Sequence, residues 1–440
     1  MKTNNKKKIL ISALAAPMVL CSATALGDDN SQLLEKLKLL EQELSAVKSA
    51  LAKQGEEQKK QAAAVQAAVA KSENKSGTSF NYGGFIKSDF MYSNYSGGER
   101  ANAGIGDEIL VPSVIPVGGS NGASRLDSHI KTSRFWFKTS TDTAAGAIDS
   151  HIELDFLTAE GNERISNSAG ARVRHAYLNW HYAEDASLLV GQTWSTLMTP
   201  GALPEAVDFI GPTSGVIFNR QSQIRWTKKL AAGGAVKVAL ENPSSSVLDA
   251  GGGISGANFD DSTLPDLVVR YDGKAGNLTY GLALLGTEVG FDNGVTSAED
   301  FGVGFSLAGK YLFANGDDLK FQFNHGPLGR FLALQPFRAA ASETGGDIST
   351  IDQTGGYVAY RHKWNDKLRS TFMYAMADTD IPAGASLANT ESVSNYNVNL
   401  IYSPTPKLSF GVEYIDAERE LANGQSGDLK RLQFMGKYAF

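Results

Sequence analysis

The feature that most constrains this chain is an alternation of apolar and polar side chains with a period of two residues, running from Phe80 to the last residue. In the segment 148–156, one set of alternate positions holds Ile, Ser, Ile, Leu and Phe, and the other holds Asp, His, Glu and Asp. This period predicts β-strands with one apolar and one polar face. The apolar face would point into a core in a soluble sandwich and toward lipid in a membrane barrel.

The connections between the predicted strands favour the membrane barrel. Short turns are expected at 142–146, 183–186, 230–233, 272–276, 315–318, 365–367 and 403–406, and long polar loops at 96–128, 159–169, 196–219, 243–263, 289–299, 326–350, 380–390 and 419–427. Short turns on one rim and long loops on the other are typical of outer-membrane barrels. Aromatic residues near strand ends predict belts at the membrane interfaces: Tyr182, Trp194, Trp226, Tyr271, Tyr311, Trp364, Tyr402, Tyr414 and Tyr438. The mean hydropathy of -0.20 excludes a bundle of transmembrane helices.

The segments predict an all-β transmembrane barrel of sixteen antiparallel strands over residues 80–440; an error of one hairpin would give fourteen or eighteen. The strands are expected at 80–95, 129–141, 147–158, 170–182, 187–195, 220–229, 234–242, 264–271, 277–288, 300–314, 319–325, 351–364, 368–379, 391–402, 407–418 and 428–440. An open edge cannot lie in lipid, so the barrel must close. The even number places both barrel ends on the periplasmic rim. The final strand ends on Phe440 with aromatics at alternate positions, resembling the C-terminal strand that the barrel-assembly machinery binds.

The N-terminus predicts a secretory signal peptide over residues 1–25. Lys2 and the lysines at 6–8 precede an apolar stretch at 9–20, and the sequence Ala-Thr-Ala at 23–25 provides a cleavage site. A membrane anchor is the alternative, but the apolar stretch is too short; lipid attachment at Cys21 would need a small residue before it, where the chain has Leu. Cleavage removes the only cysteine, which suits an oxidising compartment.

Residues 26–70 predict a periplasmic coiled coil in front of the barrel. The seam comprises Leu33, Leu37, Leu40, Leu44, Val47 and Leu51, spaced alternately by four and three residues. So narrow an apolar stripe needs a partner helix, and the same segment of another subunit would provide it. A single amphipathic helix lying on another surface is the alternative. The polar segment 71–79 is expected to be a linker.

The charge of the barrel is negative overall, whereas its predicted lumen carries many cations. Residues 1–25 have four lysines and no acids, and residues 26–79 have eight of each sign, so 29 basic and 39 acidic residues remain, a net charge of -10. A nucleic-acid partner is therefore not expected. Lumen-facing bases are Lys87, Arg134, Lys138, Arg225, Lys237, Arg270, Lys310, Lys320, Arg361, Lys363, Arg369, Arg431 and Lys437, and lumen-facing acids are Asp89, Asp149, Glu153, Asp155, Glu241 and Glu413. Arg172 and Arg174 have the opposite parity, which indicates a bulge or a position at the rim.

The long loop after the fifth strand carries Glu205 and Asp208. In general porins the corresponding loop folds inward, and its acids face bases on the opposite wall. By that resemblance Lys87, Arg134, Lys138, Arg174 and Arg431 would form a basic ladder opposite Glu205 and Asp208. With Arg225 and Arg361 they are the expected pore-lining residues. Such a field would orient a small anion in transit, and arginine suits carboxylates because it donates two parallel hydrogen bonds. The alternative is that these groups only solvate the lumen.

Several segments together resemble the DcaP-like outer-membrane porin family: GFIKSDFMYSNY, RFWFKTSTDT, RHAYLNW, GQTWSTLM and the predicted coiled coil. The resemblance implies a homotrimeric, sixteen-stranded porin in the outer membrane of a Gram-negative bacterium. It also implies uptake of small dicarboxylic and aromatic acids. The net negative charge of the barrel agrees with anion uptake only if its acids concentrate in the outer loops.

Two other functions stay open, and an enzyme is not expected. The chain could be a general diffusion porin without anion preference, or a structural protein whose barrel anchors a helix that links outer membrane and periplasm. The six histidines lack metal-ligand spacing, and no G-x-S-x-G motif is present. No catalytic residue, metal or cofactor is predicted.

Overall fold

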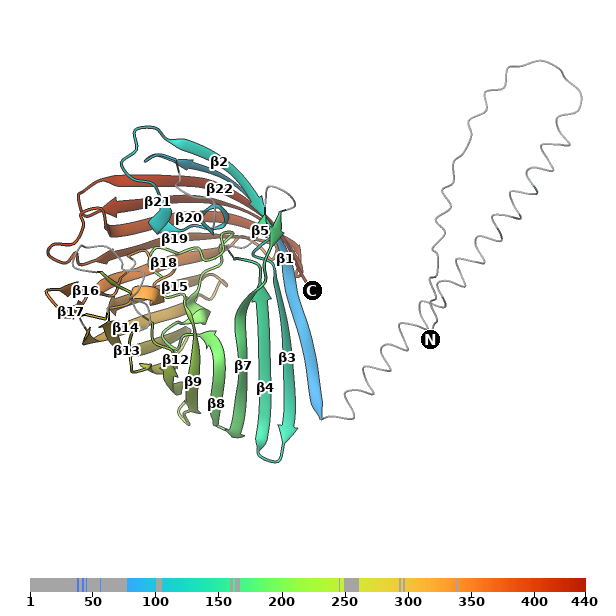
Figure 1. The fold of residues 1–440 in the computed structure, drawn as a ribbon. Helices are drawn as coiled ribbons and strands as arrows, with labels where there is room; N and C mark the ends of the chain where they lie inside the picture. Colours follow the sequence, from blue (N-terminus) through green and yellow to red (C-terminus); the bar gives the residue numbers. More distant parts are fainter. Residues whose placement is uncertain are drawn as a thin grey trace, which may run out of the picture. The chain divides into compact units, whose positions relative to one another are not determined.

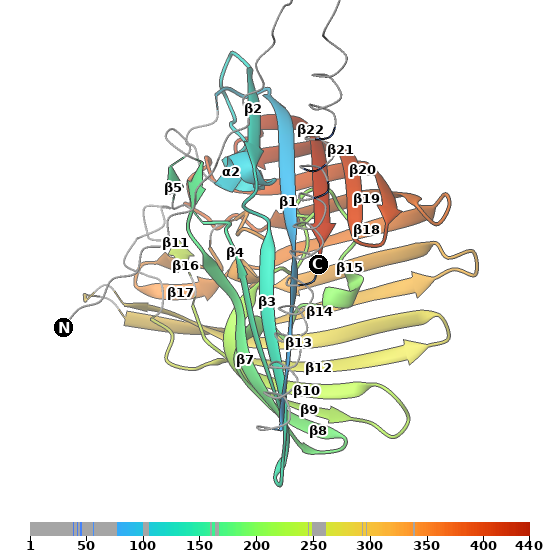
Figure 2. The same ribbon diagram turned by 90° about the vertical axis from the view of Figure 1, so that its right-hand side faces the viewer.

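The computed structural model describes positions 38, 42, 45 and 56 and residues 77–99, 105–158, 161–162, 167–244, 246–248, 261–292, 294–295, 297–337 and 339–440. Gly77–Phe440 form one compact unit, separate from Met1–Ser76. This unit is a closed antiparallel barrel (Figures 1 and 2). Its strands are β1 (Thr78–Tyr95), β3 (Arg134–Thr143), β4 (Gly146–Asp155), β7 (Arg172–Ala183), β8 (Ala186–Trp194), β9 (Arg220–Lys229), β10 (Ala235–Glu241), β12 (Asp266–Ala275), β13 (Leu278–Asp292), β14 (Ser297–Leu312), β15 (Asp318–Gly326), β18 (Gln353–Lys363), β19 (Leu368–Thr379), β20 (Thr390–Thr405), β21 (Leu408–Leu421) and β22 (Ser426–Ala439).

The predicted closure and the sixteen strands are confirmed. The first strand pairs with the last over Phe85–Tyr95 and Leu429–Ala439, so the sheet has no open edge there. Both the start of β1 and the end of β22 lie on the rim of the short turns, as the even strand number requires. Phe440 follows the last strand and packs against Phe135, with ring centroids 5.7 Å apart.

The second strand differs from its prediction because it is broken. An additional strand, β2 (Ala123–His129), pairs with the second half of β1, Asp89–Tyr95. The strand β3 pairs with the first half, Thr78–Phe85. Residues 130–133 form the break between them. The predicted single segment 129–141 was therefore wrong at its start, because polar residues at 123–128 continue the strand beyond the lipid, where alternation of hydrophobicity gives no signal.

The rims otherwise follow the prediction, with two loops shorter than expected. Residues 289–299 and 419–427 were predicted as loops, but β13, β14, β21 and β22 extend through most of them, leaving connections at 293–296 and 422–425. The strands β11 (Val247–Leu248), β16 (Ala341–Thr344) and β17 (Asp347–Thr350) form a small separate sheet. A two-residue pair, β5 (Gly161–Asn162) with β6 (Ser168–Ala169), lies between β4 and β7.

The outer surface of the barrel is apolar, as the alternation requires. On β22, Leu432 and Phe434 are exposed, whereas Arg431 and Gln433 are buried. Eight of the nine predicted belt aromatics are also exposed on this surface: Tyr182, Trp226, Tyr271, Tyr311, Trp364, Tyr402, Tyr414 and Tyr438. Trp194 was assigned wrongly, because its ring packs inside the barrel against Phe218 at 4.7 Å.

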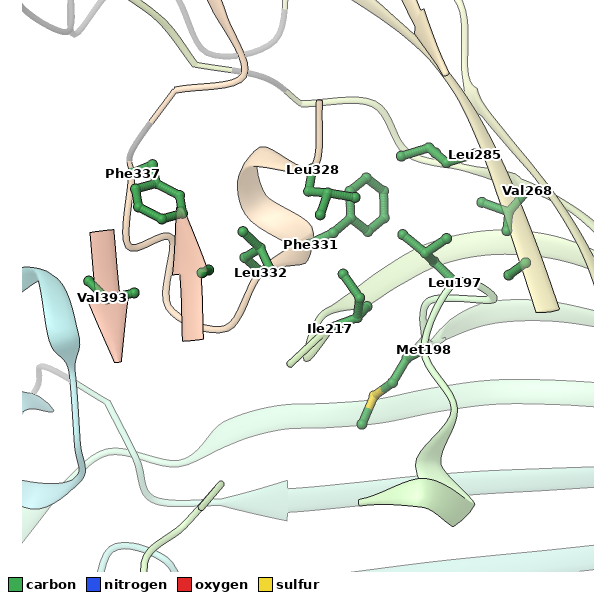
Figure 3. Close-up of a cluster of buried hydrophobic side chains, with 12 residues drawn as sticks. Leu197, Met198, Ile217, Val268, Leu285, Leu328, Phe331, Leu332, Phe337 and Val393 are labelled. Atoms are coloured by element: carbon green, nitrogen blue, oxygen red, sulfur yellow. The ribbon is translucent and has the colours of Figure 1, made fainter. Parts of the chain in front are cut away.

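Loops fill much of the barrel interior. Residues 195–219, the long loop after β8, lie inside with its short helix η2 (Pro200–Ala202). Leu197, Met198 and Ile217 of this loop pack into a buried cluster with Leu328 and Phe331, near the helix η3 (Gly329–Phe331) of the loop after β15 (Figure 3). The loop between β1 and β2 carries α2 (Ile105–Glu108) and η1 (Pro112–Val114), and its Leu110 packs against Ile415 of the wall.

The predicted signal peptide lies outside the described residues. The same holds for the predicted coiled coil, except positions 38, 42, 45 and 56, and for the predicted linker, except residues 77–79. Lys38, Gln42, Ser45 and Glu56 are helical. Among the residues that the structure describes, no helix is both long enough and apolar enough to cross a membrane.

Candidate pore constriction

The loop 195–219 is fixed to the barrel wall by hydrogen bonds from lumen-facing side chains to its backbone. Lys320 Nζ donates to Leu203 O at 2.6 Å, and the Tyr357 hydroxyl donates to Ala202 O at 2.7 Å. Asn395 Nδ2 donates to Gly211 O at 3.0 Å. The bonds to Ala202 and Gly211 are buried, and the bond to Leu203 is partly buried. Carbonyls removed from water need such partners. The wall of β15, β18 and β20 therefore holds the loop across the lumen.

The fully buried carboxylate of Glu413 is the central anchor of this loop. It accepts hydrogen bonds from the backbone N–H groups of Val207 and Asp208, both at 3.0 Å, and from the side-chain amides of Asn397 and Asn399 at 3.0 and 2.9 Å. Four donors to one ionisable group stabilise its burial. Glu413 was predicted to face the lumen, but its role is to hold the loop.

The two acids of the loop have other direct partners than the predicted basic ladder, although Asp208 lines one cavity with Lys87, Arg134 and Arg174 and Glu205 lines another with Lys87. Glu205 forms a bidentate pair with Arg369, with Nε and Nη2 at 2.6 and 2.5 Å from its carboxylate oxygens. Asp208 is buried and accepts from the backbone N–H groups of Leu110 and Ile210, both at 3.2 Å. Burial alone would raise the pKa of Glu205, but the hydrogen bond and charge of Arg369 outweigh burial and hold that pKa below its usual value.

Arg174 lies at a bulge, which explains its unexpected parity in the sequence. The register between β4 and β7 shifts between Glu153 and Leu154, so Arg174 and its neighbour His175 both point inward. Arg174 is fully buried and donates to Glu153 at 2.7 Å and Asp155 at 2.8 Å. The bulge predicted as one of two explanations is therefore present.

Four arginines gather around these two carboxylates and form what we call the arginine cluster: Arg134, Arg172, Arg174 and Arg220. Arg172 donates to both oxygens of Asp155 at 2.9 and 2.8 Å, and Arg134 Nε lies 3.4 Å from Glu153. Arg134 Nε and Arg220 Nη1 are buried and lack a hydrogen-bond partner among the described residues. The cluster thus holds more positive than negative charge and unused donors.

The cluster faces aromatic rings of the loop and of β8. The Arg174 guanidinium lies 5.4 Å from the ring of Phe209 and 5.6 Å from Trp194, and Arg220 lies 5.0 Å from Trp194. A cavity of about 210 Å³ separates the wall from the loop. It is lined by Lys87, Arg134, Arg174 and Lys437 on the wall and by Leu203, Ala206, Asp208, Phe209 and Phe218 of the loop. The wall side is cationic, and the loop side is apolar except for Asp208, whose carboxylate accepts backbone hydrogen bonds.

The seven predicted pore-lining residues divide into three groups. Lys87, Arg134 and Arg174 share this cavity, although Lys87 is mostly buried between Asp89 and Val207 O, both 2.7 Å from its Nζ. Lys138 is exposed near the rim of the short turns, with its Nζ 4.8 Å from the Trp136 ring centroid. The remaining three lie elsewhere on the inner wall: Arg225 on β9, Arg361 in an ion pair with Asp318 on β15, and Arg431 on β22.

Arg431 is not a pore-lining residue, so that prediction was wrong. Its guanidinium is buried and donates to Ser93 Oγ at 2.8 Å and Gly106 O at 3.0 Å. The helix α2 covers it, and no pattern in the sequence predicts that the first long loop also folds inward. Arg220 and Arg172 were missed as members of the site. The sequence feature that could have identified them is their position, because each is the first residue of a strand that follows a long loop.

Like charges also stand directly opposite one another on the inner wall. The strand registers pair Lys87 with Lys437, Lys237 with Arg270, Lys310 with Lys320 and Lys363 with Arg369. Directly opposed like charges destabilise a sheet by roughly 0.2–1 kcal/mol each. Each pair has a carboxylate beside at least one of its members: Asp89 at Lys87, Asp272 at Lys237 and Arg270, Asp318 at Lys310, Asp366 at Lys363 and Glu205 at Arg369. In the described part of the chain, no group of three or more His, Cys, Asp or Glu residues could hold a metal ion.

A closed sixteen-stranded barrel with an inward-folded loop and a cation-lined interior defines an outer-membrane channel of the porin class. The family model of the DcaP outer membrane protein matches residues 17–440, and the chain belongs to this family. A comparison with curated protein sequences gives no match.

Three solved structures illustrate the likeness of the fold. The outer membrane channel DcaP of Acinetobacter baumannii aligns with a TM-score of 0.69 at 24% identity, over 83% of this chain and 98% of that one. The anion-selective porin from Comamonas acidovorans aligns with a TM-score of 0.52 at 11% identity, over 82% and 100%. OmpF of Salmonella typhi aligns with a TM-score of 0.52 at 11% identity, over 83% and 98%.

Proposed function

We propose that this protein is a porin that prefers small organic anions, such as dicarboxylic acids, over cations and neutral solutes. The observation that carries the proposal is the arginine cluster, in which four guanidinium groups share two carboxylates beside a cavity. A carboxylate in that cavity would supply acceptors for Arg134, which lines the cavity and whose buried Nε lacks a hydrogen-bond partner in the described structure. A cation would instead add to the positive charge.

The opposed like charges of the wall support the same preference. An anion between Lys87 and Lys437 would relieve their repulsion, whereas a cation would increase it. Because the constriction narrows the aqueous path, solutes pass close enough to these groups to interact with them. The apolar side of the cavity, with Phe209 and Phe218, favours acids that carry a hydrocarbon or aromatic part.

The net negative charge of residues 80–440 does not oppose this proposal, because many exposed acids lie at the rim of the long loops. They include Glu99, Asp292, Glu299, Asp347, Asp380, Glu391 and Glu418.

Swelling of proteoliposomes tests the proposal with solutes of similar size. Vesicles containing the full-length protein would be compared in isotonic succinate, an uncharged sugar and a neutral amino acid. We expect succinate to enter fastest. Equal rates for solutes of equal size would favour a general diffusion porin, and no swelling with any solute would favour a barrel that serves only as an anchor.

The proposal includes a homotrimer with a periplasmic coiled coil, exported by a signal peptide cut after residue 25. The a/d seam of residues 33–51 supports self-association. Chemical cross-linking in intact outer membranes would give trimers; cross-linking that yields only monomers would contradict this part of the proposal.

A further inference from the structure

A second cation-lined cavity lies beside the constriction loop, apart from the arginine cluster. It has a volume of about 380 Å³, and its walls come from β10, β12, β13 and β14 and from residues 199–202 of the loop. It shares no lining residue with the cavity of the arginine cluster. A cavity of this size can hold a small organic molecule.

The charged lining of this cavity consists of Lys237, Arg270, Asp272, Lys274 and Lys310, so four cations face one acid. Asp272 is shared between Lys237 at 2.7 Å and Arg270 at 2.6 Å. Lys310 lies 3.9 Å from its nearest carboxylate, that of Asp318. Lys274 is exposed and has no ion pair or side-chain hydrogen bond within the part of the chain that the structure describes.

The strand registers place the two less paired lysines in one row. Lys274 of β12 is opposite Thr279 of β13, and Thr279 is opposite Lys310 of β14. Two strand spacings separate the lysines, about 10 Å between their backbones. Their flexible side chains can converge on one bound molecule from two sides, with the threonine hydroxyl between them. Two such ammonium groups match a molecule with two anionic ends.

The back of the cavity is rigid. Arg270 is nearly fully buried and donates to Met198 O at 2.7 Å, which ties β12 to the loop. Its guanidinium lies against Gly281 of β13, in space that a Cβ at this position would occupy. Lys274 and Thr279 are close to the turn between β12 and β13, on the rim of the short turns, which is periplasmic in this class of barrel.

We infer that this cavity, which we call the vestibule site, binds small organic dianions on the periplasmic side of the constriction loop. The inference rests on the proposed function and deepens it, because it gives the permeating anion a second binding site after the arginine cluster. A solute that leaves the constriction would exchange one set of ammonium and guanidinium partners for another. Anions arriving from the periplasm would bind the vestibule site first.

Single-channel recording of the full-length protein in planar bilayers, with succinate on the periplasmic side, tests the inference. We expect succinate to interrupt the current, and the double variant Lys274→Gln/Lys310→Gln to weaken its apparent binding about fivefold. The charge-matched control is Lys229→Gln/Lys367→Gln, which removes two exposed lysines from turns of the same rim that do not line this cavity. The control should bind succinate as the wild type does.

A charge-conserving double variant separates the loss of charge from an effect of misfolding. Lys274→Arg/Lys310→Arg should keep the succinate interruptions, and an equal loss in both double variants would overturn the inference. Equal binding by Lys274→Gln/Lys310→Gln and the control would overturn it as well, even if the wild type remains anion-selective. Failure of the proposed function would instead appear as a lack of anion preference in the wild-type reversal potential.

Discussion

The two halves of the inner wall carry the same kinds of polar side chain, but they use them differently. On β15 to β21, the side chains of Lys320, Tyr357 and Glu413 are hydrogen-bonded to the backbone of the loop 195–219. Lys320 and Tyr357 donate to its carbonyls, and Glu413 accepts from its N–H groups. On β3 to β9, Arg134 Nε and Arg220 Nη1 are buried and have no hydrogen-bond partner in the described structure, although Arg134 Nε lies 3.4 Å from the Glu153 carboxylate. Whether the loop provides a partner therefore decides if a lumen-facing residue is structural or available to a solute.

The first prediction removes the main anchor of the loop-holding half. Glu413→Ala leaves the N–H groups of Val207 and Asp208 without their acceptor, at a cost of about 1–3 kcal/mol for each buried donor. We expect the loop to leave the wall, single-channel conductance to rise severalfold and the thermal unfolding temperature to fall. Glu418→Ala, an exposed acid on the same strand, is the control. Unchanged conductance would mean that the other hydrogen bonds hold the loop alone.

The second prediction removes charge from the solute-facing half. Arg134→Ala should lower the flux of a dicarboxylate severalfold more than the flux of an uncharged sugar, because only the acid uses the guanidinium. Lys138→Ala removes a cation of the same strand that is exposed near the rim, and should have a smaller effect. Radiolabelled uptake into proteoliposomes measures both fluxes. If Arg134→Ala lowered both fluxes equally, the arginine cluster would only solvate the lumen and would not bind the acid.

The third and smallest prediction concerns pH and the pair of Glu205 with Arg369. Because the pKa of Glu205 is lowered in the folded protein, the pair stabilises the loop above the unfolded pKa, and this contribution is lost as pH falls through the folded value. Glu205 therefore stays ionised between about pH 7 and about pH 5, and the single-channel conductance should stay constant over this range. Glu205→Gln should imitate stronger acid. A conductance change in wild type near neutral pH that Glu205→Gln abolishes would contradict this assignment.

The sequence predicts the barrel well because alternation is imposed by lipid on every strand. It also indicates the bulge at Arg174, where the parity of a charged residue conflicts with its strand. It does not predict which lumen charges are neutralised, because the partners of Glu205 and Asp208 come from distant residues such as Arg369 and Leu110. The sequence also does not predict the burial of Arg431, because no local sequence pattern distinguishes a loop that folds inward from one that faces solvent.

The claim that the arginine cluster makes this channel anion-selective is tested most directly by the reversal potential across a salt gradient in planar bilayers. The wild type should show a potential of the sign that anion preference requires. Arg220→Gln should move it toward zero, because it removes a guanidinium whose Nη1 lacks a protein partner in the described structure. A wild-type potential of the opposite sign, or one that Arg220→Gln leaves unchanged, would contradict the account.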